Sequence, residues 1–283
     1  MVMKINFSNF AGEINVRKTF LVQNVRTLYV LMLSLMLLCI GCELHLRPSD
    51  DKASDDEIVV ERYDQLEIRY VTTGDFAALQ QMNTGYPAET RMLIEDVLQL
   101  GEADAPDIKT KFLAFFQDST LRILVKDVEK EYAEMDDVNE QLTAAFRSLR
   151  NMLPKLRLPQ IYAQVGSLDQ SIVVGDGRLG ISLDKYLGSD YPLYIKFGYT
   201  ERQRVMMTRE AIVPDCLGFY LLSLYPLSAD KAASQEEREL HMGRIQYVVN
   251  KAMGRRFFAN DNVLRVEKME KENKSLSVER LLQ

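Results

Sequence analysis

The chain has 283 residues, of which 47% are hydrophobic and 27% are charged, and its formal net charge is −6 at pH 7. This composition is typical of a globular protein with one large domain or two smaller ones. The negative charge argues against a nucleic-acid partner, which would require a basic surface. The sequence holds two histidines, His45 and His241, and no His-Glu-x-x-His pair, which excludes a zinc hydrolase of that helical type.

Residues 1–41 predict a secretory signal. Residues 1–27 carry four basic residues and one acid, and an apolar run follows over residues 28–40. A run of this length is too short to span a bilayer, which takes about 20 residues. It is typical of the apolar region of a signal peptide that follows a basic segment.

The signal ends in Cys39-Ile40-Gly41-Cys42, which resembles the lipobox of bacterial lipoproteins, although leucine is usual where Cys39 stands. The resemblance implies cleavage before Cys42 and a diacylglycerol on its thiol, so the lipid bilayer is the expected partner of acylated Cys42. The mature domain then keeps Cys216 alone and forms no internal disulfide. The alternative is an uncleaved signal anchor.

Residues 42–57 predict a lipidated, disordered tether, because they are polar and acidic with little to bury. Removing residues 1–41 deletes four basic residues and one acid, which changes the net charge from −6 to −9. The expected location is the cell envelope, on a periplasm-facing membrane. The outer membrane is favoured over the inner one, and exposure on the cell surface is a weaker alternative.

Residues 58–283 predict a single globular domain whose first part is mostly helical. Extended segments are expected over residues 58–64 and 66–70, and a break over residues 80–87. Apolar residues at helical spacing then predict helices after residues 90, 104 and 118, and over residues 135–153. We expect Phe112, Phe115 and Phe116 to belong to the core, with a peptide-binding groove as the alternative.

A small sheet is expected after Pro154, which ends the helices. Residues 161–165 predict a strand, and residues 172–183 predict a β-hairpin that turns at Asp176-Gly177. Because helices are expected before and after these strands, the predicted fold class is α+β, mostly α-helical, with a helical bundle and a small three-stranded sheet.

Tyrosines and carboxylates follow the hairpin closely, at Asp184, Tyr186, Asp190, Tyr191 and Tyr194. Further on, Asp215 stands in the nearly apolar run 211–222, for which Thr208 is a candidate helix cap. We expect the Asp215 carboxylate to cap this segment or to pair with one of three basic residues, Arg202, Arg204 or Arg209.

The carboxyl-terminal part predicts two more helices. The first begins near Ser234 and runs to Met253, with His241 as a half-exposed residue. The second covers residues 262–283 and is charged, and its last fifteen or so residues are expected to be loose.

Residues 180–194 resemble the motif of the GldB-type gliding-motility lipoproteins of Bacteroidota. Residues 212–215 and 240–247 also resemble that family, and the similarity covers roughly residues 60–270. The resemblance implies a membrane-anchored factor associated with gliding and with the secretion machinery linked to it.

That family in turn resembles zinc peptidases, which implies a zincin-like architecture. By order along the chain, residues 213–219 take the place of the metal-binding motif, with Phe219 at its second histidine position. Adjacent residues on a helix, such as Asp215 and Cys216, point about 100° apart and do not bind one ion together. We therefore expect a degenerate scaffold with no catalytic residues, no metal and no cofactor.

The resulting first hypothesis is a non-catalytic, lipid-anchored pseudo-peptidase scaffold or binding factor that binds another envelope protein. Its candidate binding residues are Asp184, Tyr186, Asp190, Tyr191 and Asp215. The second hypothesis is an unconventional hydrolase that uses the paired carboxylates of Asp184 and Asp215. The third is a glycan-binding lipoprotein that uses three of the tyrosines, Tyr186, Tyr191 and Tyr194.

Overall fold

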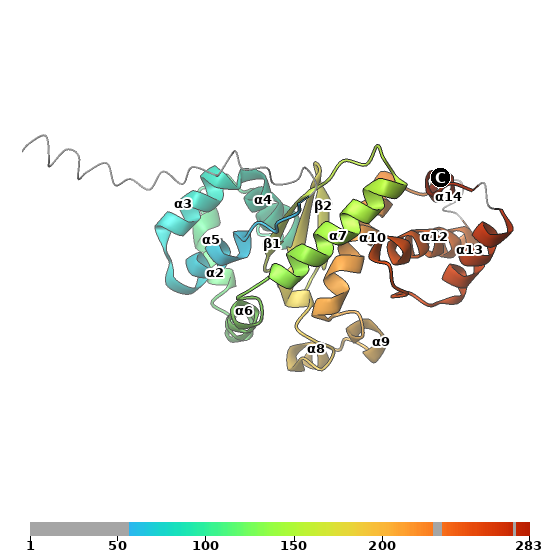
Figure 1. Ribbon diagram of the computed structural model, residues 1–283. Helices are drawn as coiled ribbons and strands as arrows, with labels where there is room; N and C mark the ends of the chain where they lie inside the picture. Colours follow the sequence, from blue (N-terminus) through green and yellow to red (C-terminus); the bar gives the residue numbers. More distant parts are fainter. Residues whose placement is uncertain (1–56, 229–233, 274–275) are drawn as a thin grey trace, which may run out of the picture. The chain divides into compact units, whose positions relative to one another are not determined.

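The computed structural model describes residues 57–228, 234–273 and 276–283, which belong to one compact unit (Figure 1). The expected signal peptide, Cys42 and the tether up to residue 56 lie outside the described residues. The described part is mostly helical with one three-stranded sheet, which confirms the predicted α+β class. None of the helices in the described ranges combines the length and apolar character that crossing a membrane requires.

Helices make up most of the described residues before the sheet, 57–159. They are α2 (Tyr63–Thr73), α3 (Phe76–Gly85), α4 (Pro87–Met92), the π-helical turn η2 (Leu93–Val97), α5 (Ile108–Phe115), α6 (Ser119–Glu131) and α7 (Asp136–Met152).

The expectation for residues 66–70 and 80–85 was wrong, because both segments are helical, in α2 and α3. The buried face of α2 includes the carboxylates of Asp64 and Glu67 beside Tyr63 and Tyr70. Because acidic residues occupy part of the core-facing side of this helix, the spacing of its apolar residues alone does not show the helical period. The chain is extended at Glu61, as expected. The backbone of Glu61 forms hydrogen bonds with Ile161 and Ala163, the two neighbours of Tyr162 in the sheet.

The remaining expected helices of this half are present. The side chains of Phe112 and Phe116 are buried in the main core, and Phe115 packs against it, so these rings belong to the core rather than to a groove. Helix α7 buries the expected apolar stripe and ends just before Pro154. Its side chains Asn139 and Thr143 also bind the extended backbone at Val60 and Ile58.

The sheet has the strand order β1-β3-β2, with β1 (Gln160–Gln164), β2 (Ile172–Gly175) and β3 (Arg178–Ser182). Strands β2 and β3 form the predicted antiparallel hairpin, and β1 runs parallel to β3. Asp176 and Gly177 have φ of +47° and +74°, the positive pair that a two-residue turn between twisted strands requires.

After the sheet come short elements and then longer helices. They are the 3₁₀ turn η3 (Leu183–Lys185), α8 (Pro192–Lys196), α9 (Glu201–Arg204), the 3₁₀ turn η4 (Arg209–Ala211), α10 (Ile212–Leu224), α12 (Gln235–Met253), α13 (Asp261–Glu272) and α14 (Val278–Leu282).

Two expectations about the carboxyl-terminal helices were wrong. His241 is a buried residue of α12 rather than a half-exposed one. Residues 276–283 are not loose, since Leu281 and Leu282 of α14 are buried and α14 contacts α12. Helices α12 and α13 also approach closely, because a Cβ at Gly243 would lie 2.7 Å from the Cβ of Asn262.

Two buried carboxyl groups hold the loop that leads from β1 to β2. Asp184 accepts hydrogen bonds from the backbone N–H groups of Gly166 (2.6 Å) and Leu168 (2.5 Å). Glu67 of α2 accepts from the N–H of Val165 at 2.9 Å. Burial raises the pKa of both acids. Leu168 has a φ of +69°, so this loop keeps a backbone conformation that L-residues rarely adopt.

Replacement of Asp184 tests this role. Asp184→Ala leaves two buried N–H groups without their acceptor, and we expect it to lower the free energy of unfolding by about 3 kcal/mol. The matched control is Asp190→Ala at a solvent-exposed aspartate, for which a change within about 0.5 kcal/mol is expected in urea titrations. Equal effects of the two substitutions would show that Asp184 does not hold the loop.

Candidate functional site

The five binding candidates do not share one cleft. Asp184 is fully buried, and its two carboxylate oxygens accept the loop hydrogen bonds described above. Asp190 lies at the opposite extreme, with a side chain that is 96% exposed and 3.7 Å from Arg204. Tyr191 donates a hydrogen bond of 2.8 Å to Asp127 on α6. These three residues join loops and helices, and none of them lines the cavity described next.

Asp215 and Tyr186 are the two candidates that the fold brings together. Tyr186 follows β3 in the chain. Its hydroxyl donates a hydrogen bond of 2.9 Å to the carboxylate of Asp215, in the first turn of α10. Ser171, just before β2, lines the same cavity as Asp215. The Tyr186–Asp215 hydrogen bond therefore joins the segment after β3 to α10.

The expected pairing of Asp215 with an arginine was wrong. Arg209 pairs with Asp137 at 2.6 Å, and Arg204 is directed toward Ser189 and Asp190. Among the described residues, no lysine or arginine forms an ion pair with Asp215. Burial raises the pKa of Asp215 to about 6, an effect that the Tyr186 hydrogen bond partly offsets. The carboxylate is therefore held in a poorly solvated place without a counter-charge.

Asp215 lines a cavity of about 350 Å³ between α10 and α12. Asp215 is the charged residue of its wall, and most of the other lining residues are apolar. Two of them are large side chains that remain exposed, Phe219 (40%) and Met242 (41%). The other lining residues are Ser171, Met206, Pro214, Gly218, Leu222, Ile245, Gln246, Val249 and Phe258. An apolar pocket with one polar anchor is the usual form of a binding site.

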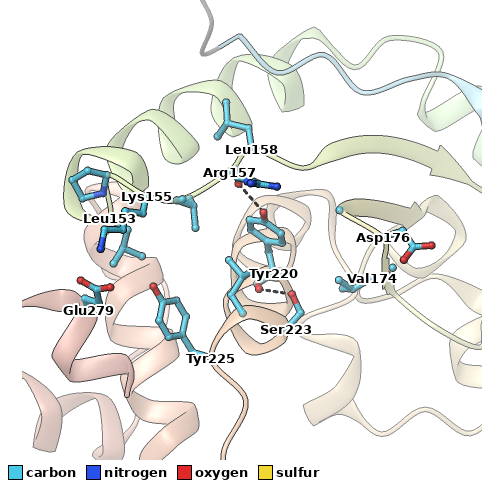
Figure 2. A pocket seen from close by; sticks show the side chains of 15 residues that line it. Leu153, Lys155, Arg157, Leu158, Val174, Asp176, Tyr220, Ser223, Tyr225 and Glu279 are labelled. Atoms are coloured by element: carbon cyan, nitrogen blue, oxygen red, sulfur yellow. Dashed lines mark hydrogen bonds between the residues drawn. The ribbon is translucent and has the colours of Figure 1, made fainter.

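A second cavity, of about 920 Å³, lies at the other end of α10 (Figure 2). Its wall comes from the residues after α7, from the β2–β3 hairpin, from the end of α10 and from Glu279 of α14. The Tyr220 hydroxyl donates a hydrogen bond of 2.6 Å to the backbone carbonyl of Arg157 and so joins two of these walls (Figure 2). No pattern in the sequence predicted this cavity, because its wall comes from segments far apart in the chain.

The geometry bears on the two alternative hypotheses. Asp184 and Asp215 do not line a common cavity: Asp184 binds the loop after β1, and Asp215 binds Tyr186 beside the cavity between α10 and α12. Tyr186 and Tyr194 are buried, and their hydroxyls bind Asp215 and the carbonyl of Asp184. Tyr191 is half-buried and its hydroxyl binds Asp127, so the three tyrosines do not form one exposed surface.

Cys216, next to Asp215, is fully buried, and burial raises the pKa of its thiol. Within the described ranges, no three His, Cys, Asp or Glu side chains are grouped so that they could hold a metal ion.

Comparisons with known proteins give one family. The profile of the family described as gliding motility protein GldB matches residues 47–257, more than half of the chain. No curated protein and no solved structure matches. The matched range includes the sheet, Tyr186 and Asp215 with the cavity beside it. The chain therefore belongs to the gliding motility protein GldB family.

Proposed function

We propose that the protein is a lipid-anchored, non-catalytic binding factor of the cell envelope whose cavity at Asp215 holds a segment of another envelope protein. Membership of the GldB family supports an envelope lipoprotein with a role related to gliding motility. The lipobox-like residues that end in Cys42 support acylation there. The anchor lies in a periplasm-facing membrane, and we favour the outer one.

The observation that carries the proposal is an unpaired carboxylate in an apolar cavity. With a pKa of about 6, Asp215 is mostly ionised at neutral pH. Keeping an ion in such surroundings lowers the stability of the fold, since burial of a charge is unfavourable without a partner. A ligand that brings an ammonium or guanidinium group on an apolar stem would supply that partner. The cavity thus fits a lysine or arginine side chain.

The same residues support a scaffold without catalysis. We propose that α10 is the counterpart of the metal-binding helix of a zinc peptidase, in a degenerate zincin-like architecture. At the positions that would carry the motif, the helix instead presents Asp215 to the cavity, buries Cys216 and exposes the ring of Phe219. The hydrogen-bond partner of Asp215 is the Tyr186 hydroxyl, and burial raises the pKa of this hydroxyl well above its ordinary value, which disfavours it as an acid–base group at neutral pH.

A photo-cross-linking experiment tests the binding proposal in cells. A benzophenone amino acid in place of Phe219, in the cavity wall, is expected to form a discrete adduct with an envelope protein. Because Asp215→Asn removes the charge and keeps the shape, we expect it to reduce this adduct about tenfold.

The matched controls are Asp190→Asn, which removes an exposed charge outside the cavity, and the benzophenone residue placed at exposed Ile195 of α8. Asp190→Asn is expected to leave the adduct unchanged, and the Ile195 position is expected to give no such adduct. An adduct at Phe219 that Asp215→Asn does not diminish would contradict the proposal.

The stability of the free protein should depend on pH through Asp215. The pKa of this group is about 6 in the folded state against an ordinary value of 3.8. Between these values the folded state binds the proton more tightly, so the free energy of unfolding decreases as pH rises. Asp215→Asn removes this loss, and we expect the variant to gain about 3 kcal/mol over the wild type between pH 3.5 and 7.5. Urea titrations at several pH values measure this gain, and a difference that does not vary with pH would refute the raised pKa.

A further inference from the structure

Helices α10 and α12 contact each other (Figure 1), and each presents one continuous stripe of side chains to the cavity at Asp215. Residues three, four and seven positions apart lie on one face of an α-helix. The stripe of α10 consists of Asp215, Gly218, Phe219 and Leu222, and that of α12 consists of Met242, Ile245, Gln246 and Val249. Each stripe is two turns long, or about 10 Å. The cavity is therefore the floor of a groove between two helices.

The rim of this groove keeps large apolar side chains exposed to solvent. Ile245 and Val249 of the α12 stripe are buried and form the floor. Phe219 and Met242, one from each helix, are exposed. Helices pack by placing the side-chain ridge of one into the groove that neighbouring helices form. A third helix laid along the two stripes would therefore cover both exposed side chains.

Gly218, within the α10 stripe, leaves space for a close neighbour. A Cβ at this position would meet no atom within 4 Å, whereas a Cβ at Gly243 of α12 would clash with Asn262 of α13. Packing inside the described structure thus explains the glycine of α12 but not that of α10. Glycine within a helix is less favourable than alanine, and it permits another chain to approach closely. A partner that packs against α10 at this point would explain Gly218.

The construction of the groove favours a helical ligand over an extended one. The backbone groups of α10 and α12 are bonded within each helix, so an extended segment would find no backbone partner on the two stripes. A helical segment satisfies its own N–H and C=O groups and contributes side chains alone. The Asp215 carboxylate, which forms no ion pair with a described residue, adds a fixed position for a cationic side chain at one end of the α10 stripe.

We infer that the groove between α10 and α12 binds an amphipathic helix of a partner protein, with a lysine or arginine at Asp215 and a small residue opposite Gly218. The inference rests on the proposed function and specifies the form of the partner segment. With the basic residue at position i of that helix, the small residue stands at i+3 and large apolar residues stand at i+4 and i+7, so that all four share one face. The apolar residues contact Phe219, Leu222 and Met242.

Two helical peptides of the same composition test this arrangement. The probe is the fluorescently labelled peptide acetyl-Gln-Aib-Gln-Lys-Gln-Aib-Ala-Leu-Gln-Aib-Leu-Gln-amide, in which α-aminoisobutyrate (Aib) favours the helix and the lysine shares a face with both leucines. Its isomer exchanges the lysine with the Aib two positions later, which moves the charge to the opposite face. Fluorescence anisotropy with the purified protein gives the Kd. We expect the isomer to bind the wild type about tenfold more weakly, and Asp215→Asn to remove this difference.

Gly218→Ala separates binding from folding. The added methyl group meets no atom of the free protein, and alanine favours a helix, so we expect the urea midpoint of unfolding to rise. The same methyl group takes up space that the partner helix needs, so we expect the probe to bind about tenfold more weakly. The matched control is Gly85→Ala in α3, where a Cβ also meets no atom within 4 Å, and it should leave the Kd unchanged.

The inference is overturned if the wild type does not bind the probe below millimolar concentration, or if the isomer binds as tightly as the probe. It also fails if Gly218→Ala leaves the Kd of the probe unchanged. In each case an adduct at Phe219 that depends on Asp215 would still support the proposed function, because that adduct does not require a helical partner. The two failures are therefore distinguishable.

Discussion

The turn that follows β3 forms hydrogen bonds with several buried polar groups at once. The arrangement of the surrounding elements depends on these hydrogen bonds. Tyr132, which follows α6, donates a hydrogen bond of 2.6 Å to the carbonyl of Tyr186, and Tyr194 donates one of the same length to the carbonyl of Asp184. The Asp184 carboxylate holds the loop after β1, and the Tyr186 hydroxyl binds Asp215 of α10. A buried donor or acceptor without its partner costs about 1–3 kcal/mol, so these bonds specify one arrangement.

This constraint positions the candidate site. Because Tyr186 is fixed at its carbonyl and at its hydroxyl, it holds the Asp215 carboxylate at the wall of an apolar cavity, next to the start of β2. The resulting charge has no partner among the described residues, and its burial lowers stability at neutral pH. A feature that weakens the free protein, and that a cationic ligand would relieve, is more simply explained by binding than by folding.

The sequence was sufficient for features that depend on local pattern. The Asp176-Gly177 turn and the apolar stripe of α7 occur where they were predicted, because turn chemistry and helical period are local. Buried acids were not predictable in this way. Asp64 and Glu67 lie on the buried face of α2, where extended segments were expected. Asp215 was expected to cap its segment or to pair with one of three arginines, and one of these, Arg209, binds Asp137 instead. Which carboxylate a given arginine meets depends on contacts between residues far apart in the chain, and the larger cavity has the same origin.

We propose that Asp215 is an accessible, poorly solvated carboxylate that binds a cationic group. The most direct measurement is an NMR titration of its side-chain carboxyl carbon against pH, with the signal assigned through Asp215→Asn, in the absence and presence of n-butylammonium chloride. We predict a pKa of about 6 for the free protein and a lower pKa when the ammonium ion is bound. A pKa near the ordinary 3.8 that the ammonium ion does not change would contradict the account.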